Sequence, residues 1–170
     1  PIKPHDKSRT GLLYSWTSSN FQPSERPFVI YVHYDRKGEV RSDIFEQLEA
    51  FGSHSDVAFV SASPDLIDNE MAMKRLREVC NIVLIRHNEG YDFGSWQAGI
   101  FYCQRYLKRV SHLILTNDSC YGPFHSFNIL FDRLFASHAD VIGLTDSTAI
   151  QRHLQSYFIA YGRRVLKSTL

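Results

Sequence analysis

The chain has 170 residues, of which 44% are hydrophobic, 14% aromatic and 22% charged. This length fits one domain, and the apolar content is enough for a packed core and too high for a disordered chain. Lys and Arg number 19 against 18 Asp and Glu, so the net charge is +1. This balance argues against a nucleic-acid-binding protein, which normally carries a basic surface. No apolar run approaches the roughly 20 residues of a membrane-spanning helix.

The start of the chain and its cysteines indicate how the protein is processed and in which redox compartment it lies. The sequence begins with Pro1, without an initiator Met or the apolar region of a signal peptide, so we expect a processed chain or a fragment of a longer protein. The three cysteines, Cys80, Cys103 and Cys120, have no C-x-x-C spacing, which favours a reduced compartment. The eight His residues form neither H-x-H nor H-E-x-x-H.

Strands and helices are predicted to alternate along the chain. Residues 1–27, rich in Pro, Ser, Lys and Arg, are expected to form a linker or N-terminal extension with a short ordered piece at residues 12–16. Five apolar runs are then predicted as strands because of their length and their β-branched residues. They cover residues 28–34, 57–61, 82–85, 113–115 and 141–144.

Four helices are predicted between these strands. The first begins at the capping residue Ser42 and ends at Gly52, and the second opens at Pro64. The third begins at Ser95, and the fourth covers residues 126–136. Apolar residues at helical spacing are expected to face the core. In the second helix these are Ile67, Met71, Leu76 and Val79, and in the third they are Trp96, Ile100, Cys103, Leu107 and Val110.

This alternation predicts an α/β fold. The strands are apolar without alternating polar residues, which is typical of a mostly parallel, Rossmann-like sheet covered by helices on both faces. Residues 28–170 are expected to form this domain, and a last segment at residues 155–161 fits either a strand or a helix.

The carboxyl ends of the predicted strands indicate where a ligand would bind, because open parallel sheets bind ligands at that edge. Polar and acidic residues gather there, most densely after the third and fourth strands. The ends cover residues 33–35, 61–63, 86–92, 116–119 and 145–147. The chain has neither the P-loop pattern nor G-x-G-x-x-G after its first strand, and Ser95 does not lie in G-x-S-x-G. Residues 92–94 spell D-F-G, but no other kinase motif accompanies them.

Three segments at this edge fit a binding site, each with a simpler interpretation. Residues 88–96 place two glycines around a polar turn that suits an anionic or sugar ligand, or that merely joins a strand to a helix. Residues 117–123 contain one carboxylate that fits a divalent cation or a sugar, or an Asx turn. Asp146 and residues 155–158 present a carboxylate and an amide to a substrate, or simply cap and pack.

The order of these segments resembles the rhamnan synthesis protein F family. The similarity spans roughly residues 28–161 and rests on four motifs at residues 88–96, 115–123, 143–147 and 153–158. It implies a GT-A-like fold and a glycosyltransferase that builds surface polysaccharides such as lipopolysaccharide or cell-wall polymers. The implied partners are a dTDP-rhamnose-like nucleotide-sugar donor and a saccharide or lipid-linked saccharide acceptor. The implied location is the cytoplasm, with the inner face of the cell membrane as a peripheral site.

The resemblance also implies roles for individual residues. GT-A enzymes have an N-x-G turn, here Asn88-x-Gly90, and a D-x-D motif, replaced here by Asn117-Asp118-Ser119. The D-x-D carboxylates hold Mg²⁺ or Mn²⁺, which neutralises the charge of the departing diphosphate. Either Asp118 therefore holds such an ion with water and diphosphate oxygens, or a cation such as Arg86 stabilises the leaving group instead.

His33, Tyr34 and Ser63 would line the nucleobase pocket, and Asn88 and Asp92 would contact the ribose or the sugar. The donor-binding residues implied in this way are His33, Tyr34, Ser63, Arg86, Asn88, Gly90, Asp92, Asn117, Ser119 and Gln155. Asp118 and Asp146 are the expected catalytic residues, with Asp146 as the general base. The alternative is a catalytically silent GT-A-like module that binds a saccharide or a partner protein. A small-molecule hydrolase has no nucleophile and base pair in its favour.

Overall fold

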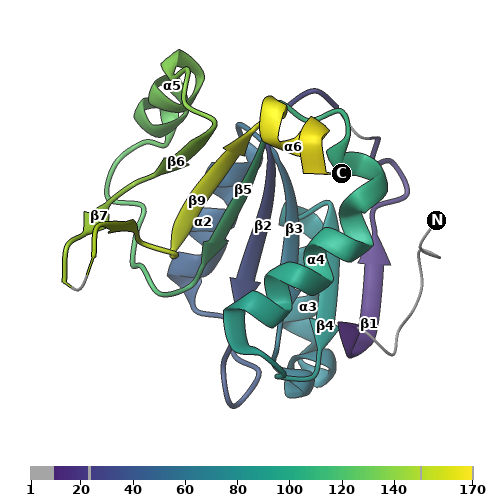
Figure 1. Ribbon diagram of the computed structural model, residues 1–170. Coiled ribbons are helices and arrows are strands. Elements are labelled where there is room, and N and C mark those ends of the chain that lie inside the picture. The colour runs from purple at the N-terminus through teal and green to yellow at the C-terminus, as the bar shows by residue number, and fades with distance from the viewer. Residues whose placement is uncertain (1–9, 23, 150, 170) are drawn as a thin grey trace.

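The computed structural model describes residues 10–22, 24–149 and 151–169. Within them, one seven-stranded sheet has the order β1-β4-β3-β2-β5-β9-β6, and β7 and β8 form a separate two-stranded ribbon (Figure 1). The strands are β1 (Leu12–Thr17), β2 (Phe28–His33), β3 (Asp56–Ser61), β4 (Ile82–Arg86), β5 (His112–Asn117), β6 (Val141–Gly143), β7 (Asp146–Ser147), β8 (His153–Leu154) and β9 (Phe158–Gly162). The helices are α2 (Ser42–Gly52), the 3₁₀ helix η1 (Pro64–Asp68), α3 (Glu70–Val79), α4 (Tyr91–Leu107), α5 (Asn128–Ala136) and α6 (Arg163–Thr169).

The sheet is mostly parallel, as the sequence predicts. Strands β4, β3, β2 and β5 run parallel to one another. The edge strand β1 is antiparallel to β4, and β9 is antiparallel to both β5 and β6. The carboxyl ends of β2 and β5 therefore lie side by side in the middle of the sheet, where ligands bind in folds of this kind.

Each face of the sheet has its own core. Along β2, Val29 and Tyr31 pack with α2, α3 and α5, whereas Ile30 and Val32 pack with α4 and α6. Figure 1 shows α4 crossing in front of the sheet and α2 and α3 behind it. Helix α4 lies very close to β2, since a Cβ added at Gly99 would be 2.7 Å from Ile30 Cγ2. The α/β fold with helices on both faces is confirmed.

The N-terminal part differs from the prediction. The ordered piece expected within the linker is β1, which pairs with β4 over Leu12–Thr17. The sheet therefore begins at Leu12 rather than at Phe28. Alternate β1 residues such as Tyr14 and Trp16 pack on the core cluster that contains α2 and α3. Residues 1–9 and 23 of the expected linker lie outside the described residues.

Helix α2 has the predicted bounds, Ser42–Gly52, but its N-cap is Arg41 rather than Ser42. The predicted start of α4 is wrong. Helix α4 begins at Tyr91, four residues before Ser95, because Gly90 adopts the left-handed conformation (φ 76°) that turns the chain into the helix. Ser95 is then buried inside the helix, where its hydroxyl accepts a hydrogen bond from Arg86 at 3.2 Å.

The predicted second helix is interrupted. It divides into η1 and α3, and the Asn69 side chain caps α3 by accepting a hydrogen bond from the Ala72 N–H at 3.1 Å. The break changes which residues face the core, so the predicted contact Met71 is 85% exposed and Ile67 is also exposed. Ala72, Met73 and Leu76 pack there instead.

The remaining elements agree closely with the sequence. The five predicted strands correspond to β2, β3, β4, β5 and β6, and the ambiguous segment at residues 155–161 contains strand β9. Among the residues that the structure describes, every helix is too short or too polar to cross a lipid bilayer.

Candidate functional site

Four residues from three elements meet at the carboxyl ends of β2 and β5, and we call them the carboxyl-end cluster: Tyr34, Asp92, Asn117 and Asp118. The Tyr34 N–H, just after β2, donates to Asp118 Oδ2 at 3.1 Å. Asn117 Nδ2, at the end of β5, donates to Asp92 Oδ2 in the first turn of α4 at 2.7 Å. Two parallel strands and a helix N-terminus are thereby joined by side chains from two of the predicted site segments, residues 88–96 and 117–123.

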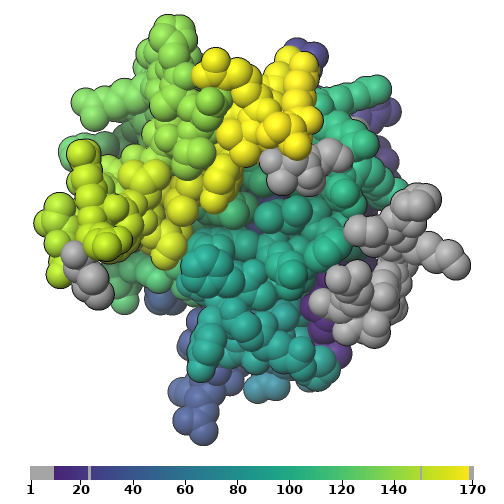
Figure 2. Space-filling view, in the orientation of Figure 1, coloured from purple at the N-terminus to yellow at the C-terminus, as the bar shows by residue number. Residues whose placement is uncertain are grey.

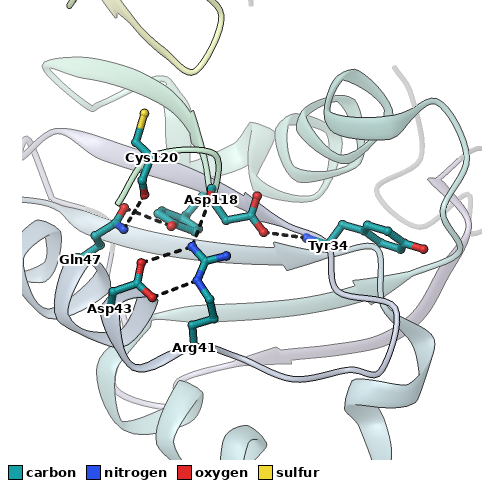
Figure 3. A network of polar contacts seen from close by, with 7 residues as sticks. Tyr34, Arg41, Asp43, Gln47, Asp118 and Cys120 are labelled. Carbon is teal, nitrogen blue, oxygen red and sulfur yellow. Dashed lines mark hydrogen bonds and ion pairs between the residues drawn. The ribbon is translucent and has the colours of Figure 1, made fainter. Parts of the chain in front are cut away.

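Asn117 organises this cluster. Its side chain is buried, and its Oδ1 accepts a hydrogen bond from the Ser119 N–H at 3.2 Å. The Asx turn proposed for this segment therefore forms, and the same side chain also binds Asp92. The turn fixes the direction of Asp118, the next residue, whose carboxylate points toward Tyr34 (Figure 3).

The surroundings of Asp118 disfavour its charged form. Partial burial raises the pKa of the Asp118 carboxyl, and the nearby Asp92 carboxylate raises it further. The Tyr34 N–H and the Arg41 guanidinium lower the pKa of Asp118 without cancelling the effect of burial. A raised carboxyl pKa near a strand end is typical of functional sites in α/β proteins.

Helix α2 contacts the loop that follows β5 (Figure 3). Arg41 donates to the Asp118 carbonyl at 3.2 Å, pairs with Asp43 at 3.0 Å and lies 4.7 Å from the centre of the Tyr121 ring. Gln47 donates through Nε2 to the Cys120 carbonyl at 3.0 Å. Sequence reasoning missed these residues. One feature of the sequence could have indicated them: Gln47 is a polar residue on the buried face of α2, between Ile44 and Phe51.

His33 and Ser63, predicted to line the nucleobase pocket, are buried instead, at 3% and 2% exposure. His33 Nδ1 lies 2.9 Å from Ser61 Oγ, and burial lowers the pKa of His33 to about 4, so its ring is neutral at neutral pH. Ser63 Oγ accepts a hydrogen bond from the Asp35 N–H at 2.7 Å. Both side chains hold the segment after β2, and among the predicted nucleobase contacts only Tyr34 is exposed.

Arg86 also bonds within the chain. It is 4% exposed and donates to the Thr10 carbonyl, to Ser95 Oγ and to the Glu89 carbonyl at 3.1, 3.2 and 2.8 Å. Burial lowers the pKa of Arg86. The turn around it is tight, because a Cβ at Gly94 would overlap the Glu89 carbonyl oxygen.

The other predicted residues of this turn remain open to solvent. Asn88 and Gly90 are exposed, as is Ser119 in the loop after β5. Gly90 and Gly94 line a hollow of about 380 Å³ next to Arg86. The structure thus leaves space beside the turn without showing a contact for Asn88.

Asp146 and Gln155 lie apart from the carboxyl-end cluster. Asp146 is on the β7-β8 ribbon, where it pairs with the exposed Arg152 at 2.7 Å. Gln155 donates its backbone N–H to the Thr145 carbonyl at 3.0 Å. In the space-filling view, the yellow-green atoms of this part stand at the left margin of the molecule (Figure 2). Within the described part of the chain, no hydrogen bond or ion pair joins Asp146 to Asp118.

A groove of about 430 Å³ lies between these two regions. Its lining includes Cys120, two residues after Asp118, and Leu144, two residues before Asp146. Aromatic side chains in its lining include Tyr121, Phe124, Phe127, Tyr157 and Phe158, and we call it the aromatic groove.

The carboxyl-end cluster does not form a metal site by itself. Among residues 10–22, 24–149 and 151–169, no group of three or more His, Cys, Asp or Glu side chains is placed to hold an ion. Asp118 and Asp92 each already accept a hydrogen bond. A metal ion at this cluster would need further oxygen ligands from a bound molecule.

Comparison with known proteins finds similarity to two sequences and to one solved structure, among others. The uncharacterized protein y4gN of Sinorhizobium fredii is 27% identical over 165 residues, which cover 95% of this chain and 42% of that protein. Virulence protein VirA of Vibrio anguillarum is 34% identical over 88 residues, 51% of this chain and 27% of that protein. A crystal structure of residues 1–349 of S. aureus TarS aligns with a TM-score of 0.47 and 15% identity, covering 84% of this chain and 48% of that one.

The chain spans less than half the length of each of these proteins. The family model for rhamnan synthesis protein F matches residues 57–170, which contain the four motifs noted in the sequence. This match covers more than half of the chain and confirms the resemblance seen in those motifs: the chain belongs to the rhamnan synthesis protein F family.

Proposed function

We propose that this chain is the donor-binding part of a glycosyltransferase that moves a sugar, rhamnose or a related deoxysugar, from a nucleotide donor to a growing surface polysaccharide. Membership of the rhamnan synthesis protein F family supports this role. The observation that carries it is the contact between Asp118 and Tyr34, at 3.1 Å, across the carboxyl ends of two neighbouring parallel strands. Nucleotides bind at this edge in open α/β sheets.

The donor would lie across the carboxyl-end cluster. The half-exposed Tyr34 ring offers an aromatic face for the base. Asp92 and Asn88 would accept hydrogen bonds from sugar or ribose hydroxyls, and Asp118 would face the diphosphate. If Mg²⁺ or Mn²⁺ takes part, Asp118 would hold it beside the diphosphate. The ion would then neutralise charge on the leaving group.

The acceptor would enter the aromatic groove between Asp118 and Asp146. Its hydroxyl oxygen would attack the anomeric carbon as the bond from that carbon to the diphosphate oxygen breaks, and its proton would pass to a carboxylate. Asp146 is the carboxylate proposed for this proton, since Leu144, two residues before it, lines the groove. Arg152 pairs with that carboxylate at 2.7 Å.

Isothermal titration of the chain with dTDP, UDP and GDP, each with and without Mn²⁺, tests the donor site. We expect at least one nucleotide to bind and Asp118→Ala to weaken that binding by about 100-fold, since the cluster loses the carboxylate that orients it. Asp132→Ala, which removes an exposed carboxylate from α5, is the matched control. Absence of binding by all three nucleotides would remove the proposal of a donor site in this chain.

A catalytically silent module that binds a saccharide or a partner is the second candidate. Asp146 favours it, because this predicted base lies on a surface ribbon in an ion pair, apart from the cluster. Donor turnover by the full-length protein, compared with its Asp118→Ala and Asp146→Ala variants, separates the two. Equal turnover in all three would remove both residues from the catalytic machinery, and donor binding without turnover would favour the silent module.

A further inference from the structure

The loop after β5 leaves the sheet directly at Asp118, and its backbone groups lose their ladder partners there. Buried or half-buried carbonyl groups need hydrogen-bond donors to replace those partners. The Cys120 carbonyl receives one from Gln47 Nε2 at 3.0 Å. The donor comes from α2, which is far from the loop in sequence and lies against it in space (Figure 3).

Gln47 itself is fixed at its other end. Its Oε1 accepts a hydrogen bond from the Tyr31 hydroxyl at 3.1 Å. Tyr31 is fully buried in the middle of β2, and Gln47 is 6% exposed. An amide with both ends bonded inside a packed core has a single orientation, because rotating it would break both bonds.

These contacts form a continuous path from the core to the carboxylate. It runs from the Tyr31 hydroxyl through the Gln47 amide to the Cys120 carbonyl, two residues after Asp118. The Asp118 carboxylate in turn accepts the hydrogen bond from the Tyr34 N–H. Tyr34 lies three residues after Tyr31, so both ends of these contacts lead back to β2 and the residue that follows it. A shift of the loop would therefore move Asp118 away from Tyr34.

We propose that Gln47 is a positioning residue for Asp118: by joining the buried Tyr31 hydroxyl to the Cys120 carbonyl, it holds the turn that presents the Asp118 carboxylate to Tyr34. Arg41 acts on the same turn from outside through the Asp118 carbonyl at 3.2 Å, but its side chain is partly exposed and also engages Asp43. The buried contact is the one that fixes the turn. Its effect on nucleotide affinity rests on the proposed function, whereas its effect on geometry does not.

The Tyr34 amide proton reports this geometry by NMR. In the unchanged protein its chemical shift should follow the ionisation of Asp118, because it donates to that carboxylate. In Gln47→Met the hydrogen bond to Cys120 is lost while the volume is nearly kept. We expect the pH-dependent shift of the Tyr34 amide to fall by at least about twofold, and the pKa of Asp118 to move down toward its ordinary range as water reaches the turn.

Two controls separate positioning from general loosening. Gln104→Met makes the same change on α4, on the other side of the sheet, and should leave the Tyr34 titration unchanged. Tyr31→Phe removes only the hydroxyl, so the Gln47–Cys120 contact remains and the loss should be smaller than in Gln47→Met. A full Tyr34 titration in folded Gln47→Met would overturn the proposal.

Nucleotide affinity gives the second readout, in the same titrations that test the donor site. Gln47→Met should weaken binding by about 10-fold, the usual effect of losing a residue that orients a binding group. Gln47→Glu, which keeps the acceptor for Tyr31 but at neutral pH lacks a donor for Cys120, should behave in the same way. Unchanged affinity and an unchanged Tyr34 titration in these variants would overturn the role of Gln47.

The two proposals fail in different ways. If the unchanged protein binds no nucleotide, the donor site is lost, while the Tyr34 titration still decides the role of Gln47. If Gln47→Met alters that titration but not the affinity, Gln47 positions Asp118 and the error lies in placing the donor on Asp118.

Discussion

The two carboxylates predicted to be catalytic, Asp118 and Asp146, are held in different ways. Asp118 follows a central strand, accepts the Tyr34 N–H at 3.1 Å and lies in a loop bonded to α2. Asp146 lies on a ribbon of two two-residue strands and has one ion pair, to an Arg152 side chain that is 82% exposed. Such short ribbons are weakly stable on their own. The comparison shows that a carboxylate at a strand end has a fixed position only where buried neighbours bond the turn that carries it.

We call the surroundings of Asp118 the first region and those of Asp146 the second. The two regions should differ most in how much stability they lose when a glycine in or beside each is replaced by alanine. Gly94→Ala places a Cβ onto the Glu89 carbonyl oxygen, a backbone atom that cannot move without opening the turn around Arg86. We expect it to lower the free energy of unfolding by about 3 kcal/mol. Gly143→Ala meets the Leu154 side chain, at 3.0 Å from its Cδ2 and 3.1 Å from its Cβ. The exposed two-residue strand β8 can shift by the few tenths of an ångström needed, so we expect a loss below about 1 kcal/mol. Urea denaturation of both variants measures the contrast.

Equal losses of unfolding free energy in Gly94→Ala and Gly143→Ala would contradict the expected difference between the two regions. Gly52→Ala serves as a control for the change itself, since a Cβ there would be 3.7 Å from its nearest neighbour, the Val79 carbonyl oxygen.

Lowering the pH should destabilise the first region because His33 becomes protonated on unfolding. Burial lowers the pKa of His33 to about 4 from its ordinary value of 6.5, so between these values the unfolded chain binds a proton that the folded chain does not. The contribution of His33 to the free energy of unfolding is therefore complete above pH 6.5 and is lost as the pH falls toward 4. The loss should reach about 2–3 kcal/mol.

Urea denaturation between pH 7.5 and 4 measures this loss as the difference between the unchanged protein and His33→Gln. Carboxyl groups elsewhere titrate in both proteins, so the difference isolates His33. Parallel pH profiles for the two proteins would show that His33 does not carry this dependence.

The sequence predicts the fold better than it predicts the site. The apolar runs at residues 28–34 and 82–85 predict β2 and β4 nearly to the residue, because buried parallel strands have a strong local signature. The capping chemistry of Ser95 predicts a helix start there, whereas the conformation of Gly90 decides where α4 begins. No residue pattern marks β7 and β8, since two-residue strands have no period.

Within the site, local sequence separates turn-forming residues from buried ones poorly. Asn117, Asp118 and Asp92 were predicted and do lie together. His33 and Ser63 follow strands in the same way but point into the protein, where they bond Ser61 and Asp35. Gln47 was missed because its partners, Tyr31 and Cys120, lie on other elements, and only the folded chain brings them together.

Removing the organising side chain of the first region should have the next largest effect. Asn117→Ala leaves the Ser119 N–H without its acceptor and the Asp92 carboxylate without its donor. We expect a loss of about 2 kcal/mol in the free energy of unfolding. Thr145→Ala removes one exposed hydrogen bond, to the Tyr157 hydroxyl at 2.7 Å, and should cost below about 1 kcal/mol. If urea denaturation shows Thr145→Ala to be the more damaging change, the ribbon is the better fixed of the two regions.

The smallest effect should come from the ion pair that holds Asp146. A double-mutant cycle with Asp146→Ala, Arg152→Ala and the double variant isolates the coupling between the two side chains. We expect less than about 1 kcal/mol, because both are exposed and water screens their attraction. The coupling should shrink further in 1 M salt, where the screening length is roughly 3 Å. A coupling above about 2 kcal/mol that resists salt would instead place Asp146 in a fixed, water-excluded position. The ribbon would then hold its carboxylate as firmly as the central sheet holds Asp118, which is the arrangement that a general base acting beside the aromatic groove requires.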